Sequence, residues 1–211
     1  MPKAWVKERK REYYYRKAKE EKYRSRAAYK LLQTVKKYRF LKEGDVVIDL
    51  GAAPGGWLQV SRKIVGNRGF VLGVDLRNIQ PLEANNVYTI AGDIKDFETR
   101  KHIENILPSL ADVVTSDVSP NISGVWEVDH ARQIDLAYES LMVALKFLKA
   151  GGNFFVKVFQ GDMFQSFVKE MKQHFARVEI IKPKASRAKS AEIFLLGMGL
   201  KKRSTTALTS L

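Results

Sequence analysis

Short apolar segments alternate with amphipathic segments along most of this chain of 211 residues. Strands separated by helices form a mainly parallel sheet with helices on both faces, so this alternation restricts the fold more than any other feature. Apolar runs predict seven strands, at residues 46–50, 70–74, 87–91, 112–116, 153–159, 177–181 and 192–198. Helical spacing predicts helices at residues 25–39, 56–65, 98–107, 129–148 and 162–174, the first with Ser25 as N-cap. We therefore expect an α/β fold.

Acidic residues stand at the ends of three of the predicted strands: Asp75, Asp117 and, after Gly92, Asp93. The carboxyl ends of parallel strands meet at one edge of a sheet, and ligands bind there. Taken one at a time, each of these residues has an ordinary alternative as a turn or helix N-cap aspartate. Together they predict an acidic ligand pocket. Asp75 would accept hydrogen bonds from ribose hydroxyls, and Asp93 would accept one from an adenine amino group.

The loop after the first strand reads D-L-G-A-A-P-G-G-W over Asp49–Trp57. Gly51, Gly55 and Gly56 allow a ligand to approach the backbone closely, although a tight turn alone would also use them. The loop lacks the lysine of a P-loop and the G-x-G-x-x-G pattern of a dinucleotide site, which disfavours a nicotinamide-dependent reductase. A small-residue loop beside acidic residues suits a nucleoside without phosphates. S-adenosylmethionine is such a molecule, and its cationic sulfonium favours an acidic pocket.

Lys157 stands between two valines in the predicted strand 153–159. Lysines are rarely buried unless they are paired or functional. One interpretation is a structural ion pair with Asp117, and the other is a role in proton transfer.

Five motifs carry a resemblance to a known family: S-R-A-A-Y-K-L at 25–31, the glycine loop at 49–57, S-D-V-S-P-N at 116–121, V-K-V-F-Q-G at 156–161 and S-R-A-K-S-A-E at 186–192. Together they resemble the FtsJ/RrmJ family of ribose 2′-O-methyltransferases over nearly the whole chain. The resemblance implies a Rossmann-like, S-adenosylmethionine-dependent methyltransferase fold. One departure is Ser119, where the bacterial enzyme for large-subunit ribosomal RNA has alanine, a change that we do not expect to alter the chemistry.

The resemblance also implies the site residues. The family's catalytic set Lys-Asp-Lys-Glu falls on Lys30, Asp117, Lys157 and Glu192, and its cofactor contacts fall on Gly55, Trp57, Asp75, Asp93 and Asp117. A ribose 2′-hydroxyl must lose its proton as it attacks the methyl carbon, and we expect a neutral Lys157 to accept it. The expected substrate is a uridine of large-subunit ribosomal RNA. Transfer RNA methylation by the same chemistry and an inactive RNA-binding ribosome assembly factor are the alternatives.

The net charge of +14 is concentrated at the two ends of the chain. Residues 1–42 carry a net charge of +12 and residues 182–211 carry +6, whereas residues 43–181 carry −4. This uneven distribution indicates a polyanionic partner, nucleic acid first, although a solubilising surface is the alternative. RNA is therefore the expected partner.

The charge pattern also suggests how the chain is organised. We expect a basic extension at 1–24, a methyltransferase domain at 25–203 and a polar tail at 204–211, and removal of 1–24 to weaken RNA binding without changing cofactor affinity. Lys182, Lys184, Arg187 and Lys189 are expected to flank the acceptor nucleotide. The chain has no cysteine and no apolar run long enough to span a membrane. We expect a cytoplasmic monomer without a metal site or membrane association.

Overall fold

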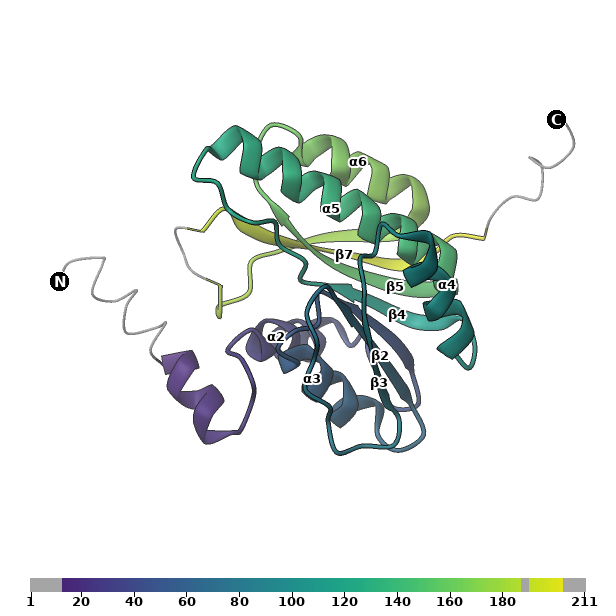
Figure 1. Ribbon diagram of the computed structural model, residues 1–211. Helices are drawn as coiled ribbons and strands as arrows, with labels where there is room; N and C mark the ends of the chain where they lie inside the picture. Colours follow the sequence, from purple (N-terminus) through teal and green to yellow (C-terminus); the bar gives the residue numbers. More distant parts are fainter. Residues whose placement is uncertain (1–12, 187–189, 203–211) are drawn as a thin grey trace, which may run out of the picture.

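A seven-stranded sheet forms the centre of the computed structural model, which describes residues 13–186 and 190–202 (Figure 1). The strand order is β3-β2-β1-β4-β5-β7-β6. The strands are β1 Val46–Leu50, β2 Phe70–Asp75, β3 Val87–Ala91, β4 Ala111–Ser116, β5 Leu148–Phe159, β6 Phe175–Ile181 and β7 Glu192–Leu200. Strands β1 to β5 pair in parallel, and β7 runs antiparallel to both β5 and β6. The predicted α/β fold with a mainly parallel seven-stranded sheet is confirmed.

Helices cover both faces of this sheet (Figure 1). They are α2 Ala28–Tyr38, α3 Gly56–Val65, α4 Phe97–Ile106, α5 Trp126–Phe147 and α6 Phe164–His174. One apolar core joins the sheet to α4, α5 and α6 through residues such as Ile103, Ile134 and Phe167. A second core joins the opposite face to α2 and α3 through Leu31 and Leu58. Burial of apolar side chains on both faces is what the near-continuous hydrophobic strands require.

Two helix starts differ from the sequence-based expectation. Ser25 is not the N-cap of α2: Ala27 occupies that position, and no side chain caps this helix. Helix α5 begins at Trp126, three residues before the predicted start at residue 129. The carboxylate of Asp129 reaches back from the first turn of α5 and accepts the backbone N–H of Ser123 at 2.7 Å. An aspartate read as a helix start therefore lies inside the helix and organises the loop before it.

Residues 13–27, the described part of the segment before α2, pack against the rest of the domain. Residues 13–20 are helical, and Ala18 is buried beside Tyr29 and Ala185. The hydroxyl of Tyr14 accepts a hydrogen bond of 2.8 Å from the Gln33 amide. The boundaries of the proposed extension, domain and tail stay predictions. Residues 1–12, the tail at 204–211, and Arg187 and Lys189 of the basic loop lie outside the described residues.

No helix in the described part of the chain is long and apolar enough to cross a membrane. The monomeric state and the cytoplasmic location stay predictions.

Candidate active site and cofactor pocket

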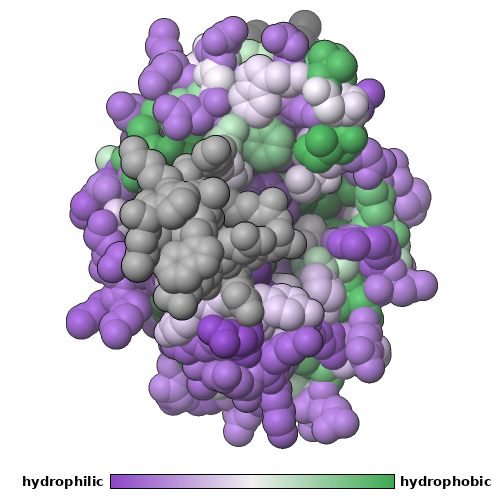
Figure 2. Space-filling model, turned by 90° about the vertical axis from the view of Figure 1, so that its left-hand side faces the viewer, coloured by the Kyte–Doolittle hydropathy of each residue, from purple (hydrophilic) through white to green (hydrophobic). Residues whose placement is uncertain are grey.

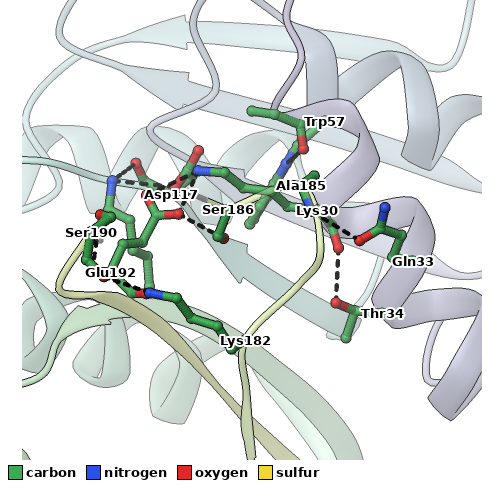
Figure 3. Close-up of polar contacts among 12 residues, drawn as sticks. Lys30, Gln33, Thr34, Trp57, Asp117, Lys182, Ala185, Ser186, Ser190 and Glu192 are labelled. Carbon is green, nitrogen blue, oxygen red and sulfur yellow. Dashed lines mark hydrogen bonds and ion pairs between the residues drawn. The ribbon is translucent and has the colours of Figure 1, made fainter. Parts of the chain in front are cut away.

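Four polar residues that lie far apart in the sequence converge at one edge of the sheet. Lys30 comes from α2, Asp117 follows β4, Lys157 lies on β5 and Glu192 begins β7. The ammonium nitrogen of Lys30 lies 2.8 Å and 2.9 Å from the two carboxylate oxygens of Glu192. The ammonium nitrogen of Lys157 lies 3.2 Å from Asp117 Oδ1. Figure 3 shows the side chains of Lys30, Asp117 and Glu192 turned toward one another.

Sheet topology explains this convergence. Strand β5 lies between β4 and β7, so the residues at the ends of those two strands approach Lys157 from opposite sides. Parallel pairing of β4 with β5 matches Ser116 to Val156 and places Asp117 beside Lys157. Antiparallel pairing of β5 with β7 matches Phe159 to Glu192. An antiparallel last strand thus brings the beginning of β7 to the edge where the parallel strands end.

Lys157 and Asp117 form a buried pair. Lys157 is 5 % exposed, and its ammonium donates a hydrogen bond of 2.8 Å to the backbone carbonyl of Asp117. Burial alone would raise the pKa of Asp117, but the positive charges of Lys157 and Lys30 outweigh it and hold this pKa below its usual range. The Asp117 side chain is therefore a carboxylate at neutral pH. Both interpretations of Lys157 survive, because a functional lysine in this position is also ion-paired.

The Glu192 carboxylate is held from two sides. Besides the ion pair with Lys30, it accepts a hydrogen bond of 3.0 Å from the Ser186 hydroxyl. Its backbone N–H donates to the Ser190 hydroxyl at 3.1 Å. These contacts come from α2 and from the loop between β6 and β7, so both elements orient Glu192.

Lys182 makes contacts within its own loop. Its ammonium donates to the backbone carbonyls of Ser190, at 2.6 Å, and of Glu192, and so holds the two ends of the basic loop together (Figure 3). Desolvation lowers the pKa of Lys182, Glu192 opposes this shift, and the nearby Lys30 charge adds to it. Two of the three N–H donors of the Lys182 ammonium are thus used within the protein, and its position beside the acceptor nucleotide stays a prediction. Lys184 remains exposed.

A cavity of about 440 Å³ opens at the same edge of the sheet. Its lining includes Gly51, Asp75, Asp93 and Asp117, which follow four successive predicted strands, together with Ala53, Val74, Leu76, Arg77, Gly92, Ile94, Val118, Ser119, Asn121 and Leu136. The acidic pocket expected from the ends of the strands is present. Its acidic residues also make ordinary loop contacts, as the alternative interpretation required. The Asp75 carboxylate accepts hydrogen bonds of 2.9 Å from the backbone N–H groups of Ala53 and Arg77. The Asp93 carboxylate accepts one of 2.9 Å from the backbone N–H of Lys95.

Gly55, Gly56 and Trp57 are not among the residues that line this cavity. A Cβ added to Gly55 would lie 2.7 Å from a guanidinium nitrogen of Arg24, and one added to Gly56 would collide with the Ser25 hydroxyl. The indole N–H of Trp57 donates to the backbone carbonyl of Ala27 at 2.8 Å. The protein's own N-terminal segment thus occupies the space beside these glycines that sequence reasoning had given to a ligand. Their role as cofactor contacts stays a prediction.

Arg24 is a site residue that sequence reasoning missed. Its guanidinium donates to the carbonyls of Pro54, at 3.3 Å, of Pro81, at 2.7 Å, and of Gln80. It therefore joins the glycine loop to the loop after β2, and both loops border the cavity. A single signal was present in the sequence: Arg24 directly precedes the first of the five motifs.

Asp49 lies beneath the glycine loop and is completely buried. Its Oδ1 accepts a hydrogen bond of 2.8 Å from the Thr115 hydroxyl, and its Oδ2 has no hydrogen-bond partner among the described residues. Burial raises the pKa of Asp49 to about 8, and the negative charges of Asp117 and Asp75 add to the shift. Asp49 is therefore protonated at neutral pH and carries no charge below the pocket.

Comparisons with known proteins agree with the site. A family model described as FtsJ-like methyltransferase matches residues 23–200. Ribosomal RNA large subunit methyltransferase E of Methanococcus maripaludis is 51% identical over 195 residues, covering 92% of this chain and 76% of the relative. The protein of the same name from Methanocaldococcus jannaschii is 50% identical over 197 residues, covering 92% of this chain and 80% of the relative.

Solved structures extend the comparison. A crystal structure described as a ribosomal RNA methyltransferase from Plasmodium falciparum is similar with a TM-score of 0.77 and 29% identity, covering 86% of this chain and all of that one. Fibrillarin of Aeropyrum pernix, solved with natively bound S-adenosyl-L-methionine, has a TM-score of 0.57 at 20% identity, covers 83% of this chain and 75% of its own, and supports the fold alone. Because the family model spans most of the chain and relatives share half of its residues, the chain belongs to the FtsJ-like methyltransferase family.

Proposed function

We propose that this methyltransferase transfers a methyl group from S-adenosylmethionine to the 2′-hydroxyl of a uridine in large-subunit ribosomal RNA. One observation carries the proposal: two lysine–carboxylate pairs, Lys30 with Glu192 and Lys157 with Asp117, converge beside an acidic cavity of which Asp117 is itself a wall. The choice of ribosomal RNA rests on the names of the archaeal relatives.

The cavity fits the proposed methyl donor. Its volume of about 440 Å³ lies within the roughly 300–1,000 Å³ typical of small-molecule sites. Asp75, Asp93 and Asp117 give it negative charge that matches a cationic sulfonium, and no basic cradle for a phosphate is needed. When bound, S-adenosylmethionine supplies an activated methyl carbon. In this proposal, Asp75 would accept hydrogen bonds from the ribose hydroxyls and Asp93 one from the adenine amino group.

The chain's own residues would then activate the acceptor. Bound S-adenosylmethionine would supply the methyl carbon that the 2′-hydroxyl attacks, and the hydroxyl proton would pass to Lys157 after the Lys157 ammonium has lost a proton to solvent. Asp117, which lines the cavity, holds the Lys157 amine through its carboxylate and its backbone carbonyl. Lys30, fixed by Glu192, places a positive charge where negative charge develops on the acceptor oxygen, or beside the neighbouring phosphate.

Radiolabelled methyl transfer tests this proposal. RNA and large ribosomal subunits from a strain that lacks the gene would be incubated with the purified protein and labelled S-adenosylmethionine, and the modified nucleotide would be mapped. We expect label on one ribose of the large-subunit RNA. Label on transfer RNA would show that transfer RNA, and not ribosomal RNA, is the substrate. Binding of S-adenosylmethionine without any methyl transfer would indicate an inactive assembly factor.

A pair of lysine variants makes the same test specific. Lys157→Ala should abolish the transfer, whereas Lys146→Ala should not. Lys146 is the matched control because it is also paired with an acid, at 2.9 Å from Glu104, but on the surface of α5.

A further inference from the structure

Three aromatic rings form a stack at the start of α5. The Trp126 ring lies over the His130 ring, with 5.6 Å between the ring centres and 19° between the planes, and over the Phe159 ring, at 6.1 Å and 19°. Trp126 nevertheless remains 44 % exposed. We call these three residues the aromatic stack. Two rings nearly parallel to the indole set its orientation, and its 44 % exposure leaves part of its apolar surface open to a partner.

The base of the aromatic stack is rigid. His130 is 5 % exposed, and its Nε2 accepts the backbone N–H of Met163 at 3.2 Å. A Cβ added to Gly161 would lie 2.8 Å from the His130 ring, so the turn after β5 fits closely against this ring. Helix α5 and the turn between β5 and α6 therefore hold the ring under Trp126 in place, and little order would be lost when a planar partner binds.

The aromatic stack lies beside the proposed catalytic residues. Phe159 follows Lys157 by two residues on β5, which places both side chains on one face of the strand about 7 Å apart. Phe159 also pairs directly with Glu192 across the sheet. On the other side, Asn121 lines the cofactor cavity and precedes Trp126 by five residues. Through Phe159, the exposed indole is therefore linked to the ends of β5 and β7 that carry Lys157 and Glu192.

The surroundings favour a base over a phosphate. Ile122, Val125 and Met163 are between 42 % and 63 % exposed in this corner. The exposed charged residues nearest the stack in the chain are the acidic Glu127 and Asp162 and the basic Arg132. Figure 2 shows this side of the molecule, where separate apolar patches lie among hydrophilic side chains in the upper half and the lower part is mostly hydrophilic. The face of an exposed ring among apolar side chains offers no hydrogen-bond donor to a phosphate, whereas every nucleobase has a flat π-face that stacks on an aromatic ring.

We propose that Trp126 is a stacking platform for an unpaired nucleobase of the RNA substrate, at or next to the nucleotide that is methylated. The proposal rests on the proposed function in one respect, namely that the substrate is RNA. Stacking of a base on Trp126 would pull the nucleotide out of a helix and hold its ribose against Lys157 and Lys30.

The first experiment measures binding of a single-stranded oligouridylate of about twelve nucleotides and of an abasic strand of the same length. Base–aromatic stacking is worth about 1–3 kcal/mol per base, so Trp126→Ala should weaken oligouridylate binding about 5- to 150-fold. Trp126→Phe should keep most of the affinity, and the abasic strand should bind wild type and Trp126→Ala equally. S-adenosylmethionine affinity should not change.

Tyr88→Ala is the matched control. Tyr88 is 46 % exposed and stacks on Phe70 with 5.1 Å between the ring centres, but it lies on the edge strand β3, away from the catalytic residues. Its removal should leave oligouridylate binding unchanged. Equal affinity of wild type and Trp126→Ala, or an equal loss with the abasic strand, would overturn the proposal and leave the exposed rings as a contact for protein.

Fluorescence gives a readout that does not depend on methyl transfer. Stacking of a base should quench the emission of Trp126, and oligouridylate should therefore quench wild type more than Trp126→Phe, whereas the abasic strand should quench neither. If oligouridylate quenches the fluorescence of wild type and Trp126→Phe equally, Trp126 is not a stacking platform. Because no turnover is measured, this result stands apart from the test of the proposed function, which fails only if no ribose is methylated.

Discussion

Arg24 lies against Gly55 so closely that a Cβ on the glycine would come within 2.7 Å of a guanidinium nitrogen. The same guanidinium donates to the carbonyls of Pro54, Gln80 and Pro81. The N-terminal segment is therefore part of the structure that shapes the cavity, and the segment expected to bind RNA meets the glycine loop at Arg24.

We expect Arg24→Ala to weaken binding of S-adenosylmethionine about five- to tenfold, or roughly 1–1.4 kcal/mol, because two cavity loops lose their common hydrogen-bond donor. Titration calorimetry would measure it. Arg16→Ala removes the same charge from an exposed position on the same segment and should leave cofactor affinity unchanged. An equal effect of both substitutions would assign the loss to net charge.

The structure changes the outcome expected for a truncation. Removal of residues 1–24 deletes Arg24, so cofactor affinity should fall, contrary to the sequence-based expectation that it would be unaffected. Removal of residues 1–12 keeps Arg24 and should spare cofactor affinity while it weakens RNA binding and flattens its dependence on salt. RNA affinities at several salt concentrations would show this. Parallel slopes with equal affinities would mean that residues 1–12 do not bind RNA.

Asp75→Ala should weaken S-adenosylmethionine binding about 10- to 150-fold, because loss of a charge-assisted hydrogen bond costs roughly 1.5–3 kcal/mol. Calorimetry would measure the affinity, with Asp96→Ala as control, since Asp96 is exposed and makes no side-chain cap at the start of α4. Unchanged affinity in Asp75→Ala would remove this residue from the ribose role.

Lys157→Arg should be nearly as inactive as Lys157→Ala, while both keep cofactor affinity. A guanidinium stays protonated at any accessible pH and cannot accept the hydroxyl proton, although it keeps the charge next to Asp117. Single-turnover methyl transfer would measure the rate. A rate restored by arginine would show that Lys157 acts through its charge alone.

The raised pKa of the buried Asp49 leads us to expect that the free energy of unfolding depends on pH. Burial raises the pKa of Asp49 to about 8, far above its value of about 3.9 in an unfolded chain. Between these values the folded protein holds a proton that the unfolded chain has lost, so the free energy of unfolding falls as pH rises from about 4 to 8. Asp49→Asn should flatten this part of the profile and stabilise the protein most at alkaline pH. Urea unfolding across this range would measure it, and an unchanged slope would show that other groups control it.

The order of strands and helices could be predicted because hydrophobic periodicity is a local property. The bounds of β1, β3 and α3 follow directly from it. Asp75, Asp93 and Asp117 could be placed together because parallel strands end at one edge of a sheet. The starts of α2 and α5 were predicted less well. The Ser25 hydroxyl packs against Gly56 instead of capping α2, and the Asp129 carboxylate accepts a hydrogen bond from the loop before α5.

The sequence by itself determined the fold class, the family and the residue types of the site, because these depend on periodicity and on motifs of neighbouring residues. Only the tertiary structure decided that Arg24 and Ser25 fill the space beside the glycine loop, that Lys182 closes its own loop, and that Trp126 stands over Phe159. The physical reason is that these contacts join segments separated by up to dozens of residues, and their geometry depends on how strands and helices pack.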